Sequence, residues 1–358
     1  MQVHQVLVTA TPGDAITNSA LELRNLLRRF GPSDVFTLNI HPDVASEVVP
    51  LADYDRRRAS YDHDDVLLFH ASIGEPGVFS FINERPERIV LVYHNISPSQ
   101  PFLPYDPAFA GLLEAGRQEL AALRDRVVLA LADSQYNADE LLELGYRDVR
   151  VSRLIIDTER MRTIEPDQQV TEWLQSIEGP VLLFVGQILP HKRPDLLLKA
   201  FHVLVTYLCP EAHLLIVGTN RIPAYAQALE SFRRELNLGS ASFRGAQSEP
   251  SWAAHYRRAD AFVTASEHEG FLVPAVESMA FGVPLVARSH AAIPETVGDA
   301  GVLLPPDEDP VLMAEAIAEV VSDRALRDDV VRRGVARLPE FDPERARAQV
   351  LEHLLSIL

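Results

Sequence analysis

The chain has 358 residues, which is enough for two domains at the usual size of about 150 residues each. Acidic residues outnumber basic residues by 51 to 33, giving a formal net charge of -18. Because nucleic acids and anionic lipid surfaces attract basic proteins, this charge argues against unaided binding to either. The single cysteine, Cys209, excludes an intrachain disulfide and a multi-thiolate metal site.

The start of the chain resembles a first strand rather than a signal peptide. No apolar run approaches the roughly 20 residues that a membrane-spanning helix needs. We therefore expect a cytoplasmic protein with no integral membrane segment.

Short apolar, β-branched runs alternate with amphipathic stretches along most of the chain, which is typical of an α/β protein with parallel sheets. In the first half, strands are expected at Gln5–Thr9, Val35–Leu38, Val66–Phe69, Ile89–Tyr93, Val128–Ala132 and Val149–Ser152. Helices are expected between them at Asn18–Phe30, Ala108–Leu123 and Asn137–Leu144.

In the second half, the strands are expected at Val181–Val185, His213–Val217, Ser242–Arg244, Ala261–Thr264, Leu285–Ala287 and Gly301–Leu303. The helices are expected at Pro194–Leu208, Ala224–Leu236, Glu249–Ala259, Val273–Phe281 and Pro310–Val321. The stretch between the halves is polar and contains Pro and Gly breakers, so we expect a hinge there. The predicted organisation is a domain over residues 1–157, a linker over 158–179, a domain over 180–340 and a terminal helix over 341–358.

Doubly wound sheets bind ligands at the carboxyl ends of their strands, so the loops at those ends are the candidates for chemistry. The strongest signal follows the strand Ala261–Thr264, where Glu269 precedes a predicted helix and Glu277 lies inside it. The N–H groups at a helix start favour an anion such as a diphosphate, and Gly270 allows close backbone approach. Carboxylates beside that anion suit sugar hydroxyls, so the pattern describes a nucleotide-sugar site. The alternative is a solvated acidic loop before a core helix.

Three further strand ends carry weaker signals. Lys192 follows the strand Val181–Val185 and could neutralise a diphosphate, although a lysine at a helix start is more often solvated. His94 lies where a buried strand opens into the predicted cleft, so it is a catalytic candidate that could contact substrate and exchange protons near neutral pH. The alternative is a structural histidine held by hydrogen bonds. Gly13 follows the first strand and could bring backbone N–H groups close to a ligand.

Other chemistries lack their motifs. The sequence contains no three-glycine dinucleotide fingerprint, no phosphate-binding P-loop and no Gly-x-Ser-x-Gly elbow. Asp62-His63-Asp64 and Asp307-Glu308-Asp309 could be metal carboxylates, but both are interpreted as solvated loops. We therefore expect neither a metal nor a separate cofactor.

Taken together, the motifs resemble those of family 4 retaining glycosyltransferases. Glu269-Gly270-Phe271 through Glu277 is similar to the Glu-x7-Glu signature of that family, and Gly186 to Lys192 is similar to its Gly-Arg-x-x-x-x-Lys element. Further similar segments are Tyr93-His94-Asn95, Asp133 to Asn137, Leu215 to Gly218, Phe243-Arg244-Gly245, Ala280 to Pro284 and Ile293-Pro294-Glu295. The resemblance is dense over residues 181–321 and sparser before them.

The resemblance implies a GT-B fold, with two doubly wound Rossmann-like domains facing a cleft and a terminal helix that crosses back to the first domain. It also implies retaining, metal-independent transfer from a nucleotide-diphosphate sugar, with the acceptor side first and the donor side second. By this resemblance, Glu277 would bind the donor ribose and Lys192 the diphosphate. Glu269, with the backbone of Gly270, Phe271 and Leu272, would bind the sugar and the phosphates. His94 would face the sugar from the first domain.

Two positions depart from the family pattern. Gln187 stands where the family usually has arginine, so Lys192, with Arg193 beside it, has more charge to neutralise. Pro12-Gly13 stands where many members have paired glycines, which weakens the case for a phosphate or acceptor contact by this loop.

The expected reaction is transfer of a hexose-type sugar to a hydroxyl acceptor by a front-face mechanism, with the leaving phosphate taking the acceptor proton. The acceptor class stays open between a small molecule, a glycan and a lipid-linked molecule. The alternatives are a GT-B phosphorylase, a pseudo-glycosyltransferase joining non-sugar rings, and a non-catalytic nucleotide-sugar-binding protein, an idea to which Gln187 lends some support.

Overall fold

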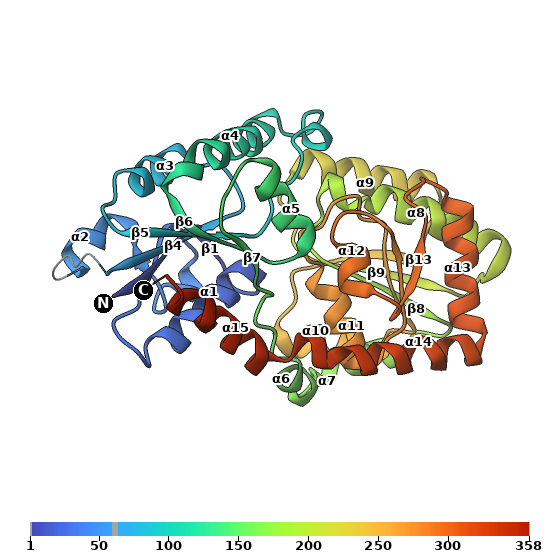
Figure 1. Cartoon of the computed structure of the whole chain (residues 1–358). Helices are drawn as coiled ribbons and strands as arrows, with labels where there is room; N and C mark the ends of the chain where they lie inside the picture. Colours follow the sequence, from blue (N-terminus) through green and yellow to red (C-terminus); the bar gives the residue numbers. More distant parts are fainter. Residues whose placement is uncertain (1, 59–63, 358) are drawn as a thin grey trace. The chain divides into compact units, whose positions relative to one another are not determined.

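The computed structural model describes residues 2–58 and 64–357, and these fall into two compact units (Figure 1). The first unit contains the chain up to Gln100, Ala108–Ile156 and the segment from Phe341 onward. The second contains Asp157–Glu340 together with the short segment Pro101–Pro107. The polypeptide therefore leaves the first unit at Gln100, returns to it at Ala108 and returns once more at Phe341.

The first unit is built on a parallel sheet with the strand order β3-β2-β1-β4-β5-β6-β7. Its central strands are almost continuously buried, as expected for a parallel sheet covered on both faces. The strands are β1 (Val3–Ala10), β2 (Val35–Ile40), β3 (Val49–Pro50), β4 (Val66–Ala71), β5 (Arg88–Tyr93), β6 (Val127–Ala132) and β7 (Val149–Val151).

Helices cover both faces of this sheet, with α3 and α4 on one side and α1 and α15 on the other (Figure 1). Asp14, Ser134 and Asp342 each accept a backbone N–H bond at the start of the helix they precede, which fixes where those helices begin. The helices are α1 (Ala15–Leu27), α2 (Tyr54–Arg57), α3 (Pro76–Asn83), α4 (Pro107–Leu123), α5 (Gln135–Glu143) and α15 (Pro343–Leu355).

The second unit has a parallel sheet with the strand order β10-β9-β8-β11-β12-β13. The strand order reverses between β8 and β11, so the loops that follow these two neighbouring strands lie at the switch point of the sheet. The strands are β8 (Val181–Val185), β9 (His213–Val217), β10 (Ala241–Gly245), β11 (Ala261–Thr264), β12 (Leu285–Arg288) and β13 (Val302–Leu304).

In this second unit, α8 and α9 lie on one face of the sheet and α10 and α11 on the other (Figure 1). The helices are α6 (Thr158–Thr163), α7 (Gln168–Gln175), α8 (Pro194–Val203, continued by a π-helical turn over Leu204–Leu208), α9 (Pro223–Glu235), α10 (Glu249–Arg258), α11 (Val273–Phe281), α12 (Ile293–Val297), α13 (Pro310–Ser322) and α14 (Arg324–Arg337). Among the residues that the structure describes, no helix is both long and apolar enough to cross a bilayer.

The architecture confirms the predicted fold class of two doubly wound Rossmann-like domains. The terminal helix α15 belongs to the first unit, where Val350 and Leu354 join the apolar core formed with β1, β4, β5 and β6. The predicted linker at residues 158–179 instead contains α6 and α7, and both belong to the second unit. The domain boundary therefore falls between Ile156 and Asp157.

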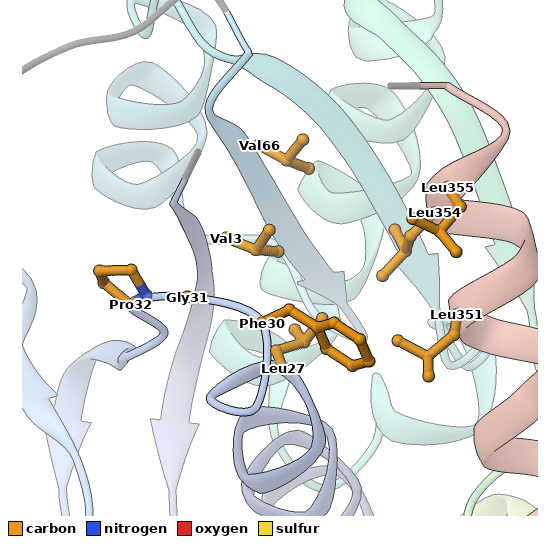
Figure 2. A pocket seen from close by; sticks show the side chains of 9 residues that line it. All are labelled: Val3, Leu27, Phe30, Gly31, Pro32, Val66, Leu351, Leu354 and Leu355. Carbon is orange, nitrogen blue, oxygen red and sulfur yellow. The ribbon is translucent and has the colours of Figure 1, made fainter.

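An apolar pocket lies where α15 meets the amino-terminal ends of β1 and β4 (Figure 2). Figure 2 shows side chains of α15 and of the two strands around it. The pocket is lined by Val3, Leu27, Phe30, Gly31, Pro32, Val66, Leu351, Leu354 and Leu355. None of these nine residues is a candidate site residue, so the pocket belongs to the packing of the terminal helix.

Candidate functional site

The strongest candidates lie in the two loops at the switch point of the second sheet. One loop runs from the end of β8 to the start of α8, and the other from the end of β11 to the start of α11. The backbone N–H of Glu267 donates to the carbonyl of His191 at 2.8 Å, which ties the two loops together. Parallel strands therefore bring residues about 75 positions apart in the sequence to one edge of the sheet.

Glycines shape the loop after β8. Gly186 has a φ of +152°, a backbone conformation that other residues rarely adopt, and the aliphatic stem of Lys192 passes over its α-carbon. At the end of β9, Gly218 has a φ of +147° and lies so close to the Gly186 carbonyl that a Cβ would overlap it. Gln187 follows Gly186 and is partly exposed. Gly218 therefore allows the close approach of the β8 and β9 ends, and the Lys192 stem lies against Gly186.

Lys192 and Glu269 form an ion pair between the two loops. Lys192 Nζ lies 2.6 Å from Glu269 Oε1, and the same oxygen accepts a hydrogen bond from Ser266 Oγ at 2.9 Å. The side chains of Lys192 and Glu269 are only 15% and 10% exposed, so solvent screens this pair less than a surface ion pair. The prediction that both residues serve one site agrees with this short distance.

Arg193 is engaged by acidic side chains and does not share the surroundings of Lys192. Its guanidinium bonds to Asp195, Glu267 and Glu308. These carboxylates raise the pKa of Arg193 further above its ordinary value, and the guanidinium lowers the pKa of Glu308 to about 2. Three carboxylates thus engage Arg193, whereas Lys192 pairs with the carboxylate of Glu269.

The loop after β11 enters α11 through a strained backbone. Leu272, which directly precedes the helix, has a φ of +74° and a ψ of +63°. A bulky residue in this left-handed conformation costs about 1–2 kcal/mol and is retained mainly where a site needs the geometry. Phe271 and Leu272 bury their side chains, and Thr296 Oγ1 donates to the Phe271 carbonyl. The two buried side chains and the hydrogen bond from Thr296 thus hold the loop that contains Glu269 and Gly270 in place before α11.

Glu277 lies on α11, one helical turn beyond this loop. The hydroxyl of Tyr256, from α10, donates to Glu277 Oε2 at 2.7 Å. Desolvation raises the pKa of the Glu277 carboxyl from its ordinary value of 4.5 to about 7, although hydrogen bonds from Tyr256 and Trp252 lower it. Tyr256 packs against Trp252 and Phe281, which holds its hydroxyl beside this carboxyl. Glu277 is therefore poised between its protonated and ionised forms near neutral pH.

His94 and Gly13 lie in the first unit. The side chain of His94 is 2% exposed and lies 2.8 Å from Asp133 Oδ2 through Nδ1 and 2.8 Å from His70 Nδ1 through Nε2. Gly13 has a φ of +73° and open space around its α-carbon, so it serves the turn before α1 rather than close packing. The roles of both residues toward a ligand stay predictions.

Several residues of these clusters were not found from the sequence. Tyr256 and Trp252 shape the Glu277 site from another helix, and Ser266 supports Glu269 from within the same loop. The signal for Ser266 in the sequence was its position, three residues before Glu269 in the same predicted loop. In the 307–309 segment, Glu308 pairs with Arg193 and Asp309 caps α13, while Asp62 and His63 lie outside the described residues.

Comparison with known proteins identifies the second unit. Residues 169–337 match the model of the family "Glycosyl transferases group 1". A D-inositol 3-phosphate glycosyltransferase from Frankia alni is 29% identical over 234 residues, which cover 63% of this chain and 57% of that protein. The O-antigen chain mannosyltransferase B from Escherichia coli is 25% identical over 279 residues, which cover 76% of this chain and 71% of that protein. The match to the Frankia protein thus spans less than two thirds of its length.

Solved structures share the whole fold. Anabaena HepE in complex with UDP and glucose has a TM-score of 0.74 at 19% identity, covering 99% of this chain and 100% of that one. A sucrose-phosphate synthase from Thermosynechococcus elongatus has a TM-score of 0.77 at 18% identity, covering 100% and 99%. With the family match, these likenesses confirm the resemblance stated from the motifs. Residues 169–337 match the glycosyl transferases group 1 family, and the chain as a whole has the GT-B fold.

Proposed function

We propose that this protein is a retaining glycosyltransferase that moves a hexose-type sugar from a nucleotide-diphosphate sugar to a hydroxyl acceptor. The observation that carries the proposal is the arrangement around α11. Glu269, in the loop before the helix, forms a partly buried ion pair with Lys192, and the Glu277 carboxyl lies on the helix. A cation, a helix start and two carboxylates match a diphosphate between two sugar rings.

Each group has a distinct task in this proposal. Lys192 binds the diphosphate and stabilises the charge that develops on it as the glycosidic bond breaks. Glu269, with the backbone of Gly270, Phe271 and Leu272, holds the sugar and the adjacent phosphate. Glu277, in its ionised form, accepts hydrogen bonds from the ribose hydroxyls, and Gln187 donates a neutral hydrogen bond where the family pattern has arginine.

The proposed chemistry proceeds on one face of the sugar. The bond between the anomeric carbon and the leaving phosphate oxygen breaks, and the acceptor oxygen bonds to the same face of that carbon. The acceptor proton passes to the departing phosphate oxygen, so no separate protein base is required. Because Lys192 supplies positive charge beside the leaving group, we propose that transfer needs no divalent metal.

The relatives support a nucleotide-sugar donor. Two of them are named as a D-inositol 3-phosphate glycosyltransferase and a mannosyltransferase, and structures of HepE were solved with UDP, with UDP and glucose, and with UDP-glucose. UDP and UDP-glucose are therefore the first probes. The low cysteine content, with Cys209 alone, is compatible with the cytoplasmic location that we propose.

The test is donor turnover with an acceptor mixture, with and without EDTA, followed by NMR of the product's anomeric configuration. We expect transfer with retention that EDTA leaves unchanged, and more than about tenfold slower turnover in Lys192→Ala, which is about 1.4 kcal/mol. Lys199→Ala, at a half-exposed lysine of the adjacent helix, is the matched control and should keep full activity. Inversion, or loss of transfer with EDTA that added metal restores, would contradict the mechanism.

Nucleotide binding without turnover of any donor would favour the non-catalytic alternative, which the Gln187 substitution suggests. A product formed only with inorganic phosphate would instead indicate a phosphorylase. Turnover of a carbasugar nucleotide instead of a sugar nucleotide would indicate a pseudo-glycosyltransferase that joins non-sugar rings. Each outcome therefore selects a different function for the same site.

A further inference from the structure

A line of buried hydrogen bonds crosses the first sheet and ends at His94. It starts at the carbonyl of Ala20 on α1, which accepts from Gln5 Nε2 at 3.0 Å. Gln5 Oε1 then lies 2.9 Å from His70 Nε2, His70 Nδ1 lies 2.8 Å from His94 Nε2, and His94 Nδ1 lies 2.8 Å from Asp133 Oδ2. The line therefore joins α1, β1, β4 and the ends of β5 and β6.

Every side chain in this line is shielded from solvent. Gln5 is completely buried, and His70, Asp133 and the ring of His94 are 1%, 3% and 2% exposed. The planes of the two imidazole rings differ by only 9°, and their centroids are 5.1 Å apart. With the nitrogens 2.8 Å apart, the rings meet edge to edge, as an in-line N–H···N bond requires.

The Ala20 carbonyl fixes which way the Gln5 amide points. A carbonyl oxygen only accepts hydrogen bonds, so the Gln5 group facing it must be the NH₂. The Gln5 oxygen consequently faces His70, and it needs a proton on His70 Nε2. At the other end, the Asp133 carboxylate also only accepts, and it needs a proton on His94 Nδ1.

The three hydrogen bonds made by the two imidazole rings need three protons, which is one more than two neutral rings supply. The bonds from His70 to Gln5, between the two rings, and from His94 to Asp133 each require one proton. Two neutral imidazoles carry two protons between them. An unprotonated contact would place two buried acceptors against each other, which is costly away from water.

We infer that Gln5 and His70 are positioning residues that hold His94 as a doubly protonated imidazolium, paired with the Asp133 carboxylate. The extra proton resides on His94 because the only carboxylate in the line contacts that ring. Burial lowers the pKa of His70 well below its ordinary value, and the neighbouring His94 lowers it further, so His70 is the neutral ring. Gln5 from β1 and the Ala20 carbonyl from α1 carry no charge.

This arrangement gives His94 an electrostatic role and excludes proton exchange. Both ring nitrogens already donate, one to Asp133 and one to His70, so neither is available as a general acid or base. The ring is a fixed cation at the carboxyl end of β5. Whether it serves glycosyl transfer rests on the proposed function, whereas its protonation state follows from the hydrogen bonds alone.

The experiment is ¹H–¹⁵N NMR of the protein labelled at histidine, recorded at about pH 8, where an unperturbed imidazole is neutral. His94 is assigned with the variant His94→Gln, and exposed His41, assigned with His41→Gln, is the internal reference. We expect both nitrogens of His94 to be protonated at this pH. A neutral His94 in the wild-type protein would overturn the inference without any variant.

Variants of Gln5 test the proton count without changing either histidine. Gln5→Leu removes the terminal acceptor, so two protons suffice and we expect His94 to lose its second proton at the same pH. In Gln5→Glu, a neutral carboxyl donates to the Ala20 carbonyl and keeps an acceptor oxygen toward His70, so this variant should keep the imidazolium. His70→Gln can accept from His94 and donate to Gln5, so it should keep the imidazolium too. If His94 stays doubly protonated in folded Gln5→Leu, verified by circular dichroism, the inference is wrong.

The readout separates this inference from the proposed function. An imidazolium that depends on Gln5, in a protein that transfers no sugar, would refute the function and leave the inference intact. Active transfer with a neutral His94 would refute only the inference.

Discussion

If Glu277 binds the ribose as proposed, the hydrogen bond from Tyr256 to Glu277 should set how nucleotide binding depends on pH. Tyr256→Phe removes a hydroxyl that donates to a carboxylate at 2.7 Å. Such bonds to charged groups contribute about 1.5–3 kcal/mol, equivalent to about one to two pKa units. The pKa of Glu277 is about 7 in the wild-type protein, so half of the carboxyls are ionised at neutral pH. In the variant, we expect about a tenth or fewer to be ionised.

If the ribose binds the ionised form, UDP affinity at pH 7 falls by about 5- to 50-fold in Tyr256→Phe and by no more than about twofold at pH 9. Isothermal titration calorimetry at both pH values measures this. Tyr54→Phe is the matched control, because Tyr54 also donates to a buried glutamate, Glu87, at 2.9 Å, but in the first unit. An equal loss at both pH values, or no loss at pH 7, would refute the reasoning.

Three other changes test the structure. Gly218→Ala should lower the free energy of unfolding in urea by more than about 2 kcal/mol, because its Cβ would overlap the Gly186 carbonyl and its φ is +147°. Gly239→Ala is the control: a Cβ there meets open space, so stability should change by less than about 1 kcal/mol. Because the pKa of Glu277 is raised when folded, the folded protein binds more protons than the unfolded chain between pH 4.5 and about 7. The free energy of unfolding of the wild type relative to Glu277→Gln should therefore fall, by up to about 3 kcal/mol, as pH rises through this window, and a flat or rising difference would contradict the raised pKa. Leu354→Ala should lower the free energy of unfolding by about 2–5 kcal/mol, because it removes a buried side chain from the α15 interface. Leu355→Ala, at a side chain that is 62% exposed, should lower it by less than about 1 kcal/mol. Equal effects would show that α15 is not docked as described.

The sheets and the donor-side loops were predictable because their signals are local. A parallel strand such as Val181–Val185 is an apolar run, and the residues that follow it necessarily lie at the carboxyl edge of the sheet. The sequence therefore predicts that Lys192 and Glu269 lie near one another, and they are in contact at 2.6 Å.

Elements without a local signal were missed. Charged residues surround α14 on all sides, so it shows no apolar stripe, and the polar sequence of residues 158–179 suggested a linker where α6 and α7 form. The left-handed Leu272 is equally invisible, because nothing in the residue type favours that conformation.

Long-range partners form a second class of unpredicted features. Tyr256 reaches Glu277 from another helix, and Gln5 reaches His70 across 65 positions of sequence. A single sequence contains no periodicity that links such residues. The pKa of Glu277 and the proton count at His94 both depend on these contacts and emerged only from the structure.

The central claim is that Lys192 binds a diphosphate while Glu277 binds the ribose of the same nucleotide. Calorimetric titration of UDP and UMP into the wild-type protein, Lys192→Ala and Glu277→Gln tests it most directly. We predict that UDP binds the wild type more than about tenfold tighter than UMP, a difference of about 1.4 kcal/mol. That difference should vanish in Lys192→Ala, whereas Glu277→Gln should weaken both nucleotides equally. If both variants lower the affinities for UDP and UMP by the same factor, or if neither nucleotide binds the wild type, the site does not bind a nucleotide diphosphate as described.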